Sequence, residues 1–249
     1  MQENAFFTHG RNDLTCVVIC AGKGTRILPN SKDMPKTMIL LSGRPIVHHI
    51  VEYWRKYTNN FLFIVGYKKN HIMKYVRQLG IQSKFIEQKE LRGIAHAISL
   101  AKDDVSDNFI VVLGDCLCLG TFSPPGAMIQ GVGVWKTESF ENIRTNYAVI
   151  IEGDRISQVI EKPKETYNNF CGMGIYFFNK NVFRYIEKTQ PSILRNEIEI
   201  TDTIQTMIHS HERFTPVYFN GKYINITFPQ DITTAEVLLH MSREQSSIR

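Results

Sequence analysis

The segment over residues 15–36 combines a glycine turn with several cations. An apolar run over 16–20 leads into a short turn that contains Gly22 and Gly24. A strand that feeds such a turn leaves backbone N–H groups free to point at an anion, and nearby cations can neutralise several phosphate oxygens at once. We therefore expect this segment to bind a polyphosphate, as a nucleotide-handling enzyme does. The cations are Lys23, Arg26, Lys32 and Lys36.

Two common phosphate-binding loops do not match this turn. The dinucleotide fingerprint G-x-G-x-x-G requires a third glycine where this chain has Ile27. A Walker loop requires four residues between its first glycine and a Gly-Lys-Ser/Thr triplet, whereas Gly22 and Gly24 are two positions apart. A lone G-x-G would favour an ordinary βα turn, so the residues that follow decide the interpretation.

Charged residues also follow strand-like runs later in the chain. Asp115 comes soon after the apolar run over 109–113, where a carboxylate could bridge a hard cation to triphosphate oxygens. Loop capping is the alternative for an isolated aspartate. Lys162 lies between Glu161 and Pro163, and because proline stops regular pairing, the lysine stands at a strand end. A solvated charge at a turn is the alternative for this lysine.

Alternating strand-like and helix-like segments must position these residues in the first half. Apolar residues over Ile46–Trp54 recur at helical spacing after Pro45, which suits a first helical position. Strands that alternate with helices pair in parallel, and ligands gather at the carboxyl ends of such strands. Gly22 and Asp115 both follow such ends. The other expected segments are strands over 61–65, 84–87 and 109–113 and helices over 72–79 and 94–101.

The second half is less regular, and we expect it to extend the same sheet and to shape an acceptor pocket. Segments 148–151 and 155–160 flank the turn over 152–154, a pattern typical of a hairpin. Asp231 suits the N-cap of the last helix. The other expected elements are a strand over 174–178 and helices over 181–188, from Thr201, and through Leu239.

Length and composition indicate one globular α/β domain. The chain has 249 residues, of which 43% are hydrophobic and 21% charged. It contains no run of eighteen apolar residues, so we expect no membrane partner. Residues 1–13 lack the apolar core of a signal peptide, and we expect an N-terminal extension there and a domain over 14–249. The net charge of +5 suits small anionic substrates, and we expect no nucleic-acid partner.

The five cysteines form no C-x-x-C pair. This usage indicates reduced cysteines in the core of a cytoplasmic protein. A zinc site is the alternative, but it would need further ligands beside His48 and His49, which have no evident partner.

Three ordered matches resemble the signature of the sugar-1-phosphate nucleotidyltransferases, also called nucleoside-diphospho-sugar pyrophosphorylases. They are Gly22-Lys23-Gly24-Thr25-Arg26, Pro35-Lys36-Thr37-Met38-Ile39 and Gly43-Arg44-Pro45-Ile46. The resemblance spans residues 15–239. It implies an α/β fold: a single Rossmann-like, GT-A-like three-layer α/β/α domain with a mostly parallel mixed central sheet. We expect its nucleotide-binding half over residues 14–120 and its acceptor-binding half over 121–249.

The resemblance also implies a set of site residues. Asp115 becomes the leading ligand for Mg²⁺, and Asn225 the second; its amide lacks the charge of the aspartate that some members have here, whereas others carry asparagine. Asp231 is the rival ligand, opposed by its expected role as a helix cap. The implied catalytic residues are Arg26, Lys36 and Lys162; the nucleotide-binding residues are Ala21, Gly22, Lys23, Gly24, Thr25, Gln88 and Gly93; the acceptor-binding residues are Glu161, Lys162, Gly174 and Glu199.

The identity of the nucleotide stays open among UTP, dTTP and CTP. The Gln88 amide can pair with the imide edge of uracil or thymine, and it can also flip to suit cytosine. Lys23 departs from the Ala-Gly-Gly of many sugar enzymes and adds a charge beside the triphosphate.

The implied reaction is transfer of an NMP group from an NTP to a phosphorylated acceptor, most simply a sugar 1-phosphate. A phosphate oxygen of the acceptor attacks the α-phosphorus in line and pyrophosphate leaves. One alternative is a cytidylyltransferase for phosphocholine, a phosphonate or another non-sugar acceptor. A second is a catalytically silent regulatory subunit. No hexapeptide repeat follows Leu239, so we expect no fused acyltransferase. A homo-oligomer is compatible with the sequence.

Overall fold

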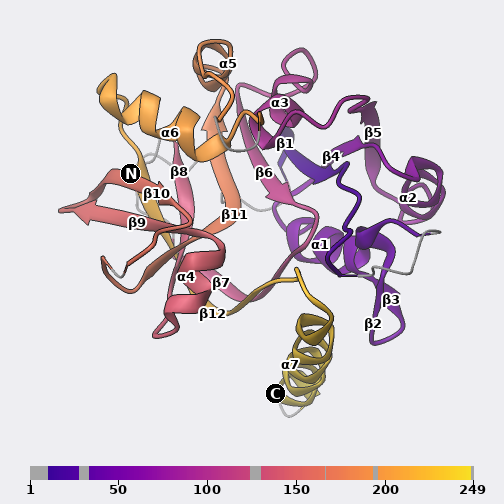
Figure 1. The fold of residues 1–249 in the computed structure, drawn as a ribbon. Coiled ribbons are helices and arrows are strands. Elements are labelled where there is room, and N and C mark those ends of the chain that lie inside the picture. The colour runs from indigo at the N-terminus through magenta and orange to yellow at the C-terminus, as the bar shows by residue number, and fades with distance from the viewer. Residues whose placement is uncertain (1–10, 28–33, 124–129, 166, 193–195, 248–249) are drawn as a thin grey trace.

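The computed structural model describes residues 11–27, 34–123, 130–165, 167–192 and 196–247 (Figure 1). Its first strand begins at Arg11, so the last residues of the expected N-terminal extension belong to the sheet. Residues 1–10 of that extension, and the cation Lys32, lie outside the described residues.

Strands and helices alternate through the first half, as the hydrophobic pattern predicts. The strands are β1 (Arg11–Cys20), β2 (Leu40–Leu41), β3 (Arg44–Pro45), β4 (Thr58–Val65), β5 (Gln82–Glu87) and β6 (Asn108–Leu113). The helices are α1 (Ile46–Trp54), α2 (Lys69–Val76) and α3 (Ile94–Ser99), preceded by the 3-10 helix η1 (Lys36–Met38). Pro45 stands one position before the first residue of α1, as its N-cap, rather than within the helix.

The second half is richer in strands than the pattern predicts. The strands are β7 (Cys116–Ser123), β8 (Gly131–Lys136), β9 (Tyr147–Glu152), β10 (Arg155–Glu161), β11 (Phe170–Asn179) and β12 (Thr215–Asn225). The helices are α4 (Phe140–Thr145), α5 (Val182–Ile186), α6 (Ile200–His209) and α7 (Pro229–Ser247). The hydrophobic pattern alone does not predict β7, β8, β12 or α4.

One large mixed sheet unites the two halves in the order β5-β4-β1-β6-β11-β8-β12-β7. Parallel pairing joins β5, β4, β1 and β6. Strand β11 then lies antiparallel between β6 and β8, and β12 pairs in parallel with β8 and antiparallel with β7. The β9–β10 hairpin attaches to β11 through β9. The expected fold class, an α/β domain on a mixed central sheet, is confirmed, with the run of parallel strands in the first half of the chain.

Helices cover both faces of this sheet (Figure 1). Alternate residues of β1 enter opposite cores: Cys16 and Val18 pack in the cluster that includes α1 and α2, and Val17 packs in the cluster that includes α3, α5 and α6. A strand that is apolar on both sides needs such cover on both faces. The sheet and the helices on its two faces therefore form three layers. The helices cover the faces of the sheet and not the ends of its strands.

Helix α7 contacts β7, β12 and β2 and runs away from the main body (Figure 1). It buries Ala235 and Leu239 and exposes Val237 and Met241. Neither α7 nor any other helix of the described residues has the length and apolar character needed to cross a membrane.

Candidate active site

A cavity of about 380 Å³ lies where the carboxyl ends of β1 and β6 meet the second half of the sheet. Most of the residues predicted from the sequence line it. They are Gly22, Gly24, Arg26, Lys36, Gln88, Gly93, Asp115, Glu161, Lys162, Gly174, Glu199 and Asn225. The buried Ala21 and the exposed Lys23 and Thr25 belong to the loop after β1 but do not line the cavity.

The loop after β1 is shaped to admit Lys36. Gly24 has a φ of +64°, and a Cβ at this position would lie 2.6 Å from the Cβ of Lys36. Glycine is therefore required both for the left-handed backbone and for the close approach of Lys36. The carbonyl of Ala21 accepts a hydrogen bond from the N–H of Tyr67 at 3.2 Å, which fixes the loop to the end of β4.

Lys36 and Asp115 form an ion pair in the cavity wall. The Nζ of Lys36 lies 2.6 Å from Oδ2 of Asp115, and the two side chains are 13% and 27% exposed. Gly114 precedes the aspartate, and a Cβ there would lie 2.6 Å from the carbonyl oxygen of Ile19. The ends of β1 and β6 thus pack closely at Gly114, and this packing fixes the backbone next to Asp115. The carboxylate predicted to bind the metal is therefore paired with Lys36, the first residue of η1.

Strand pairing brings Asn225 beside Asp115. Strands β7 and β12 run antiparallel with Asn225 opposite Cys116. The N–H of Ile226 donates to the carbonyl of Asp115 at 2.9 Å. Asp115 and Asn225, distant in the sequence, are therefore held as neighbours by backbone hydrogen bonds.

Asp231, the rival metal ligand, is engaged at the start of α7. Its Oδ2 accepts hydrogen bonds from the N–H groups of Thr227 and Phe228, each at 2.7 Å. The helix begins at Pro229, so Asp231 lies within the first turn and its carboxylate reaches back, instead of standing at the N-cap as the sequence suggested. Asp231 therefore caps the start of α7 as predicted, but from within the first turn of the helix.

The donor atoms in this corner fit Mg²⁺. A carboxylate and an amide oxygen are hard ligands, and Mg²⁺ commonly takes one or two of them from protein and the others from water and substrate phosphates. Asp115 and Asn225 supply such a pair in the cavity. Within the described part of the chain, no group of three or more His, Cys, Asp or Glu side chains is placed to hold a metal ion. A metal at this site would therefore take its remaining ligands from water and substrate oxygens.

At another wall of the cavity, the amide of Gln88 is held in one orientation. The side chain is 5% exposed, and its Nε2 donates to the carbonyl of Gly93 at 3.2 Å and lies 3.0 Å from Nδ1 of His96. A carbonyl oxygen only accepts, so the NH₂ group must face Gly93. Burial, followed by the charge of Arg92, lowers the pKa of His96, which keeps its Nδ1 available as an acceptor. The NH₂ group of Gln88 is thereby engaged by Gly93 and His96, and its Oε1 takes part in neither contact.

Gly93 also ties this wall to the segment that precedes α6. Its φ is +100°, and a Cβ would lie 2.5 Å from the carbonyl oxygen of Ile198. The N–H of Ile198 in turn donates to the carbonyl of Arg92 at 2.8 Å. This backbone contact places Glu197 and Glu199, which flank Ile198, on the cavity wall.

This side of the cavity combines the cation Lys162 with three carboxylates, those of Glu161, Glu197 and Glu199. The Nζ of Lys162 lies 3.4 Å from Oε1 of Glu161, and Oε2 of Glu161 accepts from the Thr201 hydroxyl at 3.2 Å. Glu199 is 8% exposed. A Cβ at Gly174 would lie 2.6 Å from the Sγ of Cys116, so the floor of the cavity is tightly packed there. Such a wall can bind a phosphate together with hydroxyl groups.

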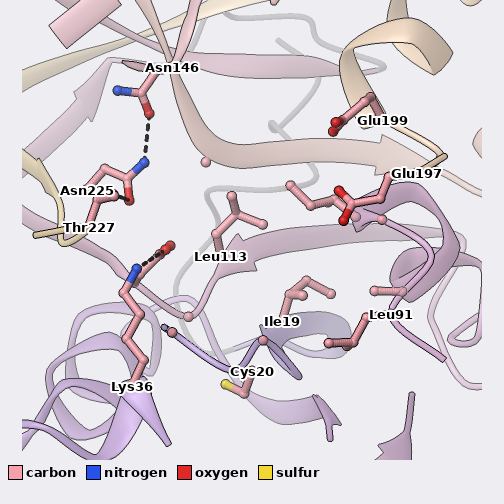
Figure 2. A pocket seen from close by; sticks show the side chains of 18 of the residues that line it. Ile19, Cys20, Lys36, Leu91, Leu113, Asn146, Glu197, Glu199, Asn225 and Thr227 are labelled. Atoms are coloured by element: carbon pink, nitrogen blue, oxygen red, sulfur yellow. Dashed lines mark hydrogen bonds and ion pairs between the residues drawn. The ribbon is translucent and has the colours of Figure 1, made fainter. Parts of the chain in front are cut away.

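Figure 2 shows Lys36, Asn225 and Thr227 on one side of the cavity and Glu197, Glu199 and Leu91 on the other. Several lining residues were not predicted to belong to the site; they include Thr37, Leu91, Asn146, Tyr147, Tyr176, Glu197 and Thr227. Thr37, Glu197 and Thr227 lie inside or next to motifs that carry predicted residues. Asn146 lies between α4 and β9 and has no such signal.

The cysteines near the cavity are not its nucleophiles. All five cysteines of the chain are buried and free. Burial, followed by the negative charge of Asp115, raises the pKa of the Cys20 and Cys116 thiols. The Sγ of Cys116 lies 2.9 Å from the hydroxyl of Tyr223, which also accepts from the N–H of Gly174 at 2.9 Å. These protonated thiols support the floor of the cavity.

The sequence model of the family described as nucleotidyl transferase matches residues 15–244. The chain belongs to the nucleotidyl transferase family. It is 34% identical over 226 residues to the bifunctional protein GlmU of Methanocaldococcus jannaschii, which covers 91% of this chain and 54% of that protein. It is 29% identical over 243 residues to the UTP–glucose-1-phosphate uridylyltransferase AglF of Haloferax volcanii, which covers 94% of this chain and all of that protein. The chain thus spans about half the length of its GlmU relatives.

Solved structures of nucleotidyltransferases share the fold. A UDP-glucose pyrophosphorylase complexed with UDP-glucose superposes with a TM-score of 0.76 at 22% identity, over 92% of this chain and 98% of that one. The inositol-1-phosphate CTP transferase from T. maritima superposes with a TM-score of 0.79 at 20% identity, over 95% of this chain and 98% of that one. The resemblance stated from the loop motifs is confirmed at the level of family and fold.

Proposed function

We propose that this nucleotidyltransferase-family chain transfers a nucleoside monophosphate from a nucleoside triphosphate to a sugar 1-phosphate, with release of pyrophosphate. The observation that carries the proposal is the distribution of charge within one cavity. Arg26 and Lys36 come from the nucleotide-binding half, Lys162 comes from the acceptor half, and Asp115 and Asn225 contact both parts. Two phosphorylated substrates need two separate sets of cations to be brought together.

The reaction is a single in-line displacement. A phosphate oxygen of the acceptor forms a bond to the α-phosphorus, the bond from that phosphorus to the β-phosphate bridging oxygen breaks, and its electron pair leaves with pyrophosphate. Phosphate oxygens are nucleophilic at neutral pH, so the residues neutralise charge and position the reactants. Lys162 binds the acceptor phosphate, Lys36 the α-phosphate and Arg26 the departing pyrophosphate.

Divalent metal ions are general cofactors of the family, and we propose Mg²⁺ at Asp115 and Asn225. A bound Mg²⁺ supplies positive charge that polarises phosphoryl oxygens. Asp115 directly precedes β7 and Asn225 ends β12, so the pairing of these two strands holds the two residues as neighbours. Lys36, already paired with Asp115, adds the second positive charge on that side.

The orientation of Gln88 favours uracil or thymine as the base. Its NH₂ group is used by Gly93 and His96, which leaves a carbonyl oxygen that only accepts. Uracil and thymine carry a ring N–H donor between two carbonyls, whereas cytosine carries a lone pair at the same ring nitrogen. UTP or dTTP is therefore favoured over CTP.

The carboxylates that line the proposed binding site of the second substrate favour a sugar phosphate as that substrate. Glu161 and Glu199 line the cavity beside Lys162, and their carboxylates can accept from hydroxyl groups next to the phosphate. AglF, which is similar to this chain over the whole length of AglF, is named for glucose 1-phosphate.

The five free, buried thiols favour a reducing, cytoplasmic location.

A matrix of substrates tests this function. UTP, dTTP and CTP are each combined with several sugar 1-phosphates, phosphocholine and a phosphonate in the presence of Mg²⁺, and pyrophosphate release is measured. We expect release with UTP or dTTP and one or more sugar 1-phosphates. Release only with CTP and a non-sugar acceptor would establish the alternative cytidylyltransferase. Nucleotide binding without release from any pair would favour a catalytically silent subunit.

A further inference from the structure

A chain of hydrogen bonds with forced directions leads from α4 to Asn225. The Nδ2 of Asn146 donates to the carbonyl oxygen of Asn142 at 2.8 Å. Because that backbone oxygen can only accept, the amide of Asn146 has one allowed orientation, with its Oδ1 turned away from α4. That Oδ1 accepts a hydrogen bond from Nδ2 of Asn225 at 2.9 Å.

The direction of these two hydrogen bonds decides which atom of its amide Asn225 offers to the cavity. Its NH₂ group is committed to Asn146, so its Oδ1 lies on the other side, where the Thr227 hydroxyl donates to it at 3.3 Å. Figure 2 shows this oxygen on the side of Asn225 away from Asn146, toward Lys36. An amide in the opposite orientation would present NH₂, which cannot bind a cation.

We propose that Asn146 is a positioning residue that selects the metal-binding orientation of the Asn225 amide; the proposal rests on the proposed metal role of Asp115 and Asn225. An asparagine ligand has one useful oxygen, whereas an aspartate has two and needs no such selection. Asn146, which does not bind the metal itself, therefore allows the uncharged Asn225 to serve as a ligand. Partners of metal ligands commonly change metal affinity about 10–100-fold when removed.

Asn146 also joins the metal corner to the acceptor side. Its backbone carbonyl accepts from the N–H of Lys162 at 3.0 Å. Lys162 has a φ of +44°, a left-handed conformation that this contact helps to hold. The backbone contact survives truncation of the Asn146 side chain, so the amide and the Lys162 contact can be separated by experiment.

A double-mutant cycle tests the proposal with Mn²⁺ as the probe, titrated into the full chain and followed by electron paramagnetic resonance of the free ion. We expect Asn146→Ala to weaken Mn²⁺ binding about 10-fold. In the Asn225→Asp background the same substitution should change the Kd less than about twofold, because a carboxylate needs no orientation. Asn146→Leu, similar in shape to asparagine, provides a second truncation should the alanine variant fail to fold.

Two controls separate the possible failures. Asn168→Ala removes a half-buried amide that also donates to a backbone carbonyl, that of Val149 at 2.9 Å, but lies outside the cavity lining; it should leave the Kd unchanged. Asp115→Asn should abolish Mn²⁺ binding.

Loss of Mn²⁺ binding in Asp115→Asn without any change of the Kd in Asn146→Ala would overturn the positioning role alone. An equal change of the Kd on Asn146→Ala in the wild-type and Asn225→Asp backgrounds would do the same. Unchanged binding in Asp115→Asn would overturn the metal site and the positioning role together.

The acceptor provides a second readout. Asn146→Ala should raise the Mg²⁺ concentration needed for half-maximal activity and leave the KM of the sugar 1-phosphate within about twofold, since the Lys162 backbone contact remains. A parallel rise in the acceptor KM would show a collapse of the turn and contradict the specific role.

Discussion

The Nζ of Lys36 lies 2.6 Å from Oδ2 of Asp115, and this contact joins η1 to the turn between β6 and β7. Both residues are partly shielded from solvent, so their charges interact more strongly than those of an exposed pair. The contact places the ammonium group of Lys36 next to the carboxylate that we assign to the metal. A triphosphate entering this corner would meet two positive charges, one from Lys36 and one from the ion.

Removal of the Lys36 cation should slow turnover without unfolding the chain. We expect Lys36→Ala to reduce kcat about 10²–10³-fold, by analogy with loss of a single electrostatic donor. Lys84→Ala, which removes the exposed partner of Asp104, provides the control and should retain full activity. Steady-state pyrophosphate release checks both variants, and near wild-type turnover by Lys36→Ala would refute its role at the α-phosphate.

The two glycines of the first loop should respond differently to substitution. Gly24→Ala introduces a Cβ 2.6 Å from that of Lys36 at a φ of +64°, whereas a Cβ at Gly22 meets no atom within 4 Å. We expect Gly24→Ala to lose about 1–2 kcal/mol, a fall in Tm of about 2–8 °C, and Gly22→Ala to keep the wild-type Tm. Thermal unfolding of both variants measures the difference. Equal Tm values would show that Gly24 is not conformationally required.

The first half of the fold is predictable because its signals are local. Strand β1 contains a continuous apolar run that is buried on both faces of the sheet, and helix α1 has apolar residues at helical spacing that it buries on one face. Strands β7 and β12 pair with one another across a long stretch of chain, and β12 contains the polar run Asn220-Gly221-Lys222. Their stability depends on partners remote in sequence, so local propensity does not reveal them.

Substitution of Lys162 can separate its charge from its backbone conformation. Lys162 has a φ of +44°, which glycine adopts without penalty. We expect Lys162→Gly and Lys162→Ala both to raise the KM of the sugar 1-phosphate at least about tenfold, with the NTP KM little changed. Lys162→Ala should in addition be less stable than Lys162→Gly by about 1 kcal/mol. Urea unfolding and two-substrate kinetics measure these effects, and a loss confined to the NTP KM would reverse the assignment of Lys162.

Nucleotide affinity should depend on the protonation of His96. Burial and Arg92 lower the His96 pKa, opposed by Glu90, below its usual value of about 6.5, so its Nδ1 accepts from Gln88 at pH 7. As the pH falls through the lowered pKa, Nδ1 becomes a donor, the Gln88 amide is released and the NTP KM rises. Stability falls in the same direction, because the unfolded chain takes up this proton at a higher pH.

His96→Ala provides the control for this pH effect. The variant should show a raised NTP KM at pH 7, about two- to tenfold for the loss of one hydrogen bond, and little further change as the pH falls. Kinetics from pH 5 to pH 8 with saturating acceptor measure it. The same pH dependence in wild type and variant would assign the effect to another group.

The candidate site was predictable where motifs mark it and not where only folding assembles it. Arg26, Lys36 and Lys162 belong to short motifs, and the structure brings them to one cavity. Asn146 belongs to none; its position follows from the end of α4 and the two amide contacts that it makes. Ala21 shows the reverse case, because a residue inside a motif serves the packing of the loop rather than the cavity.

Direct transfer of the nucleotidyl group tests the central claim most clearly. The chain is mixed with Mg²⁺, a sugar 1-phosphate and UTP or dTTP that carries ³²P at the α-position, and the label is followed over a single turnover. We expect the label to pass into the NDP-sugar with none on acid-precipitated protein, and to stay on the triphosphate in Asp115→Asn. Label on the protein, or bound triphosphate that remains unconverted with every sugar 1-phosphate, would contradict the account.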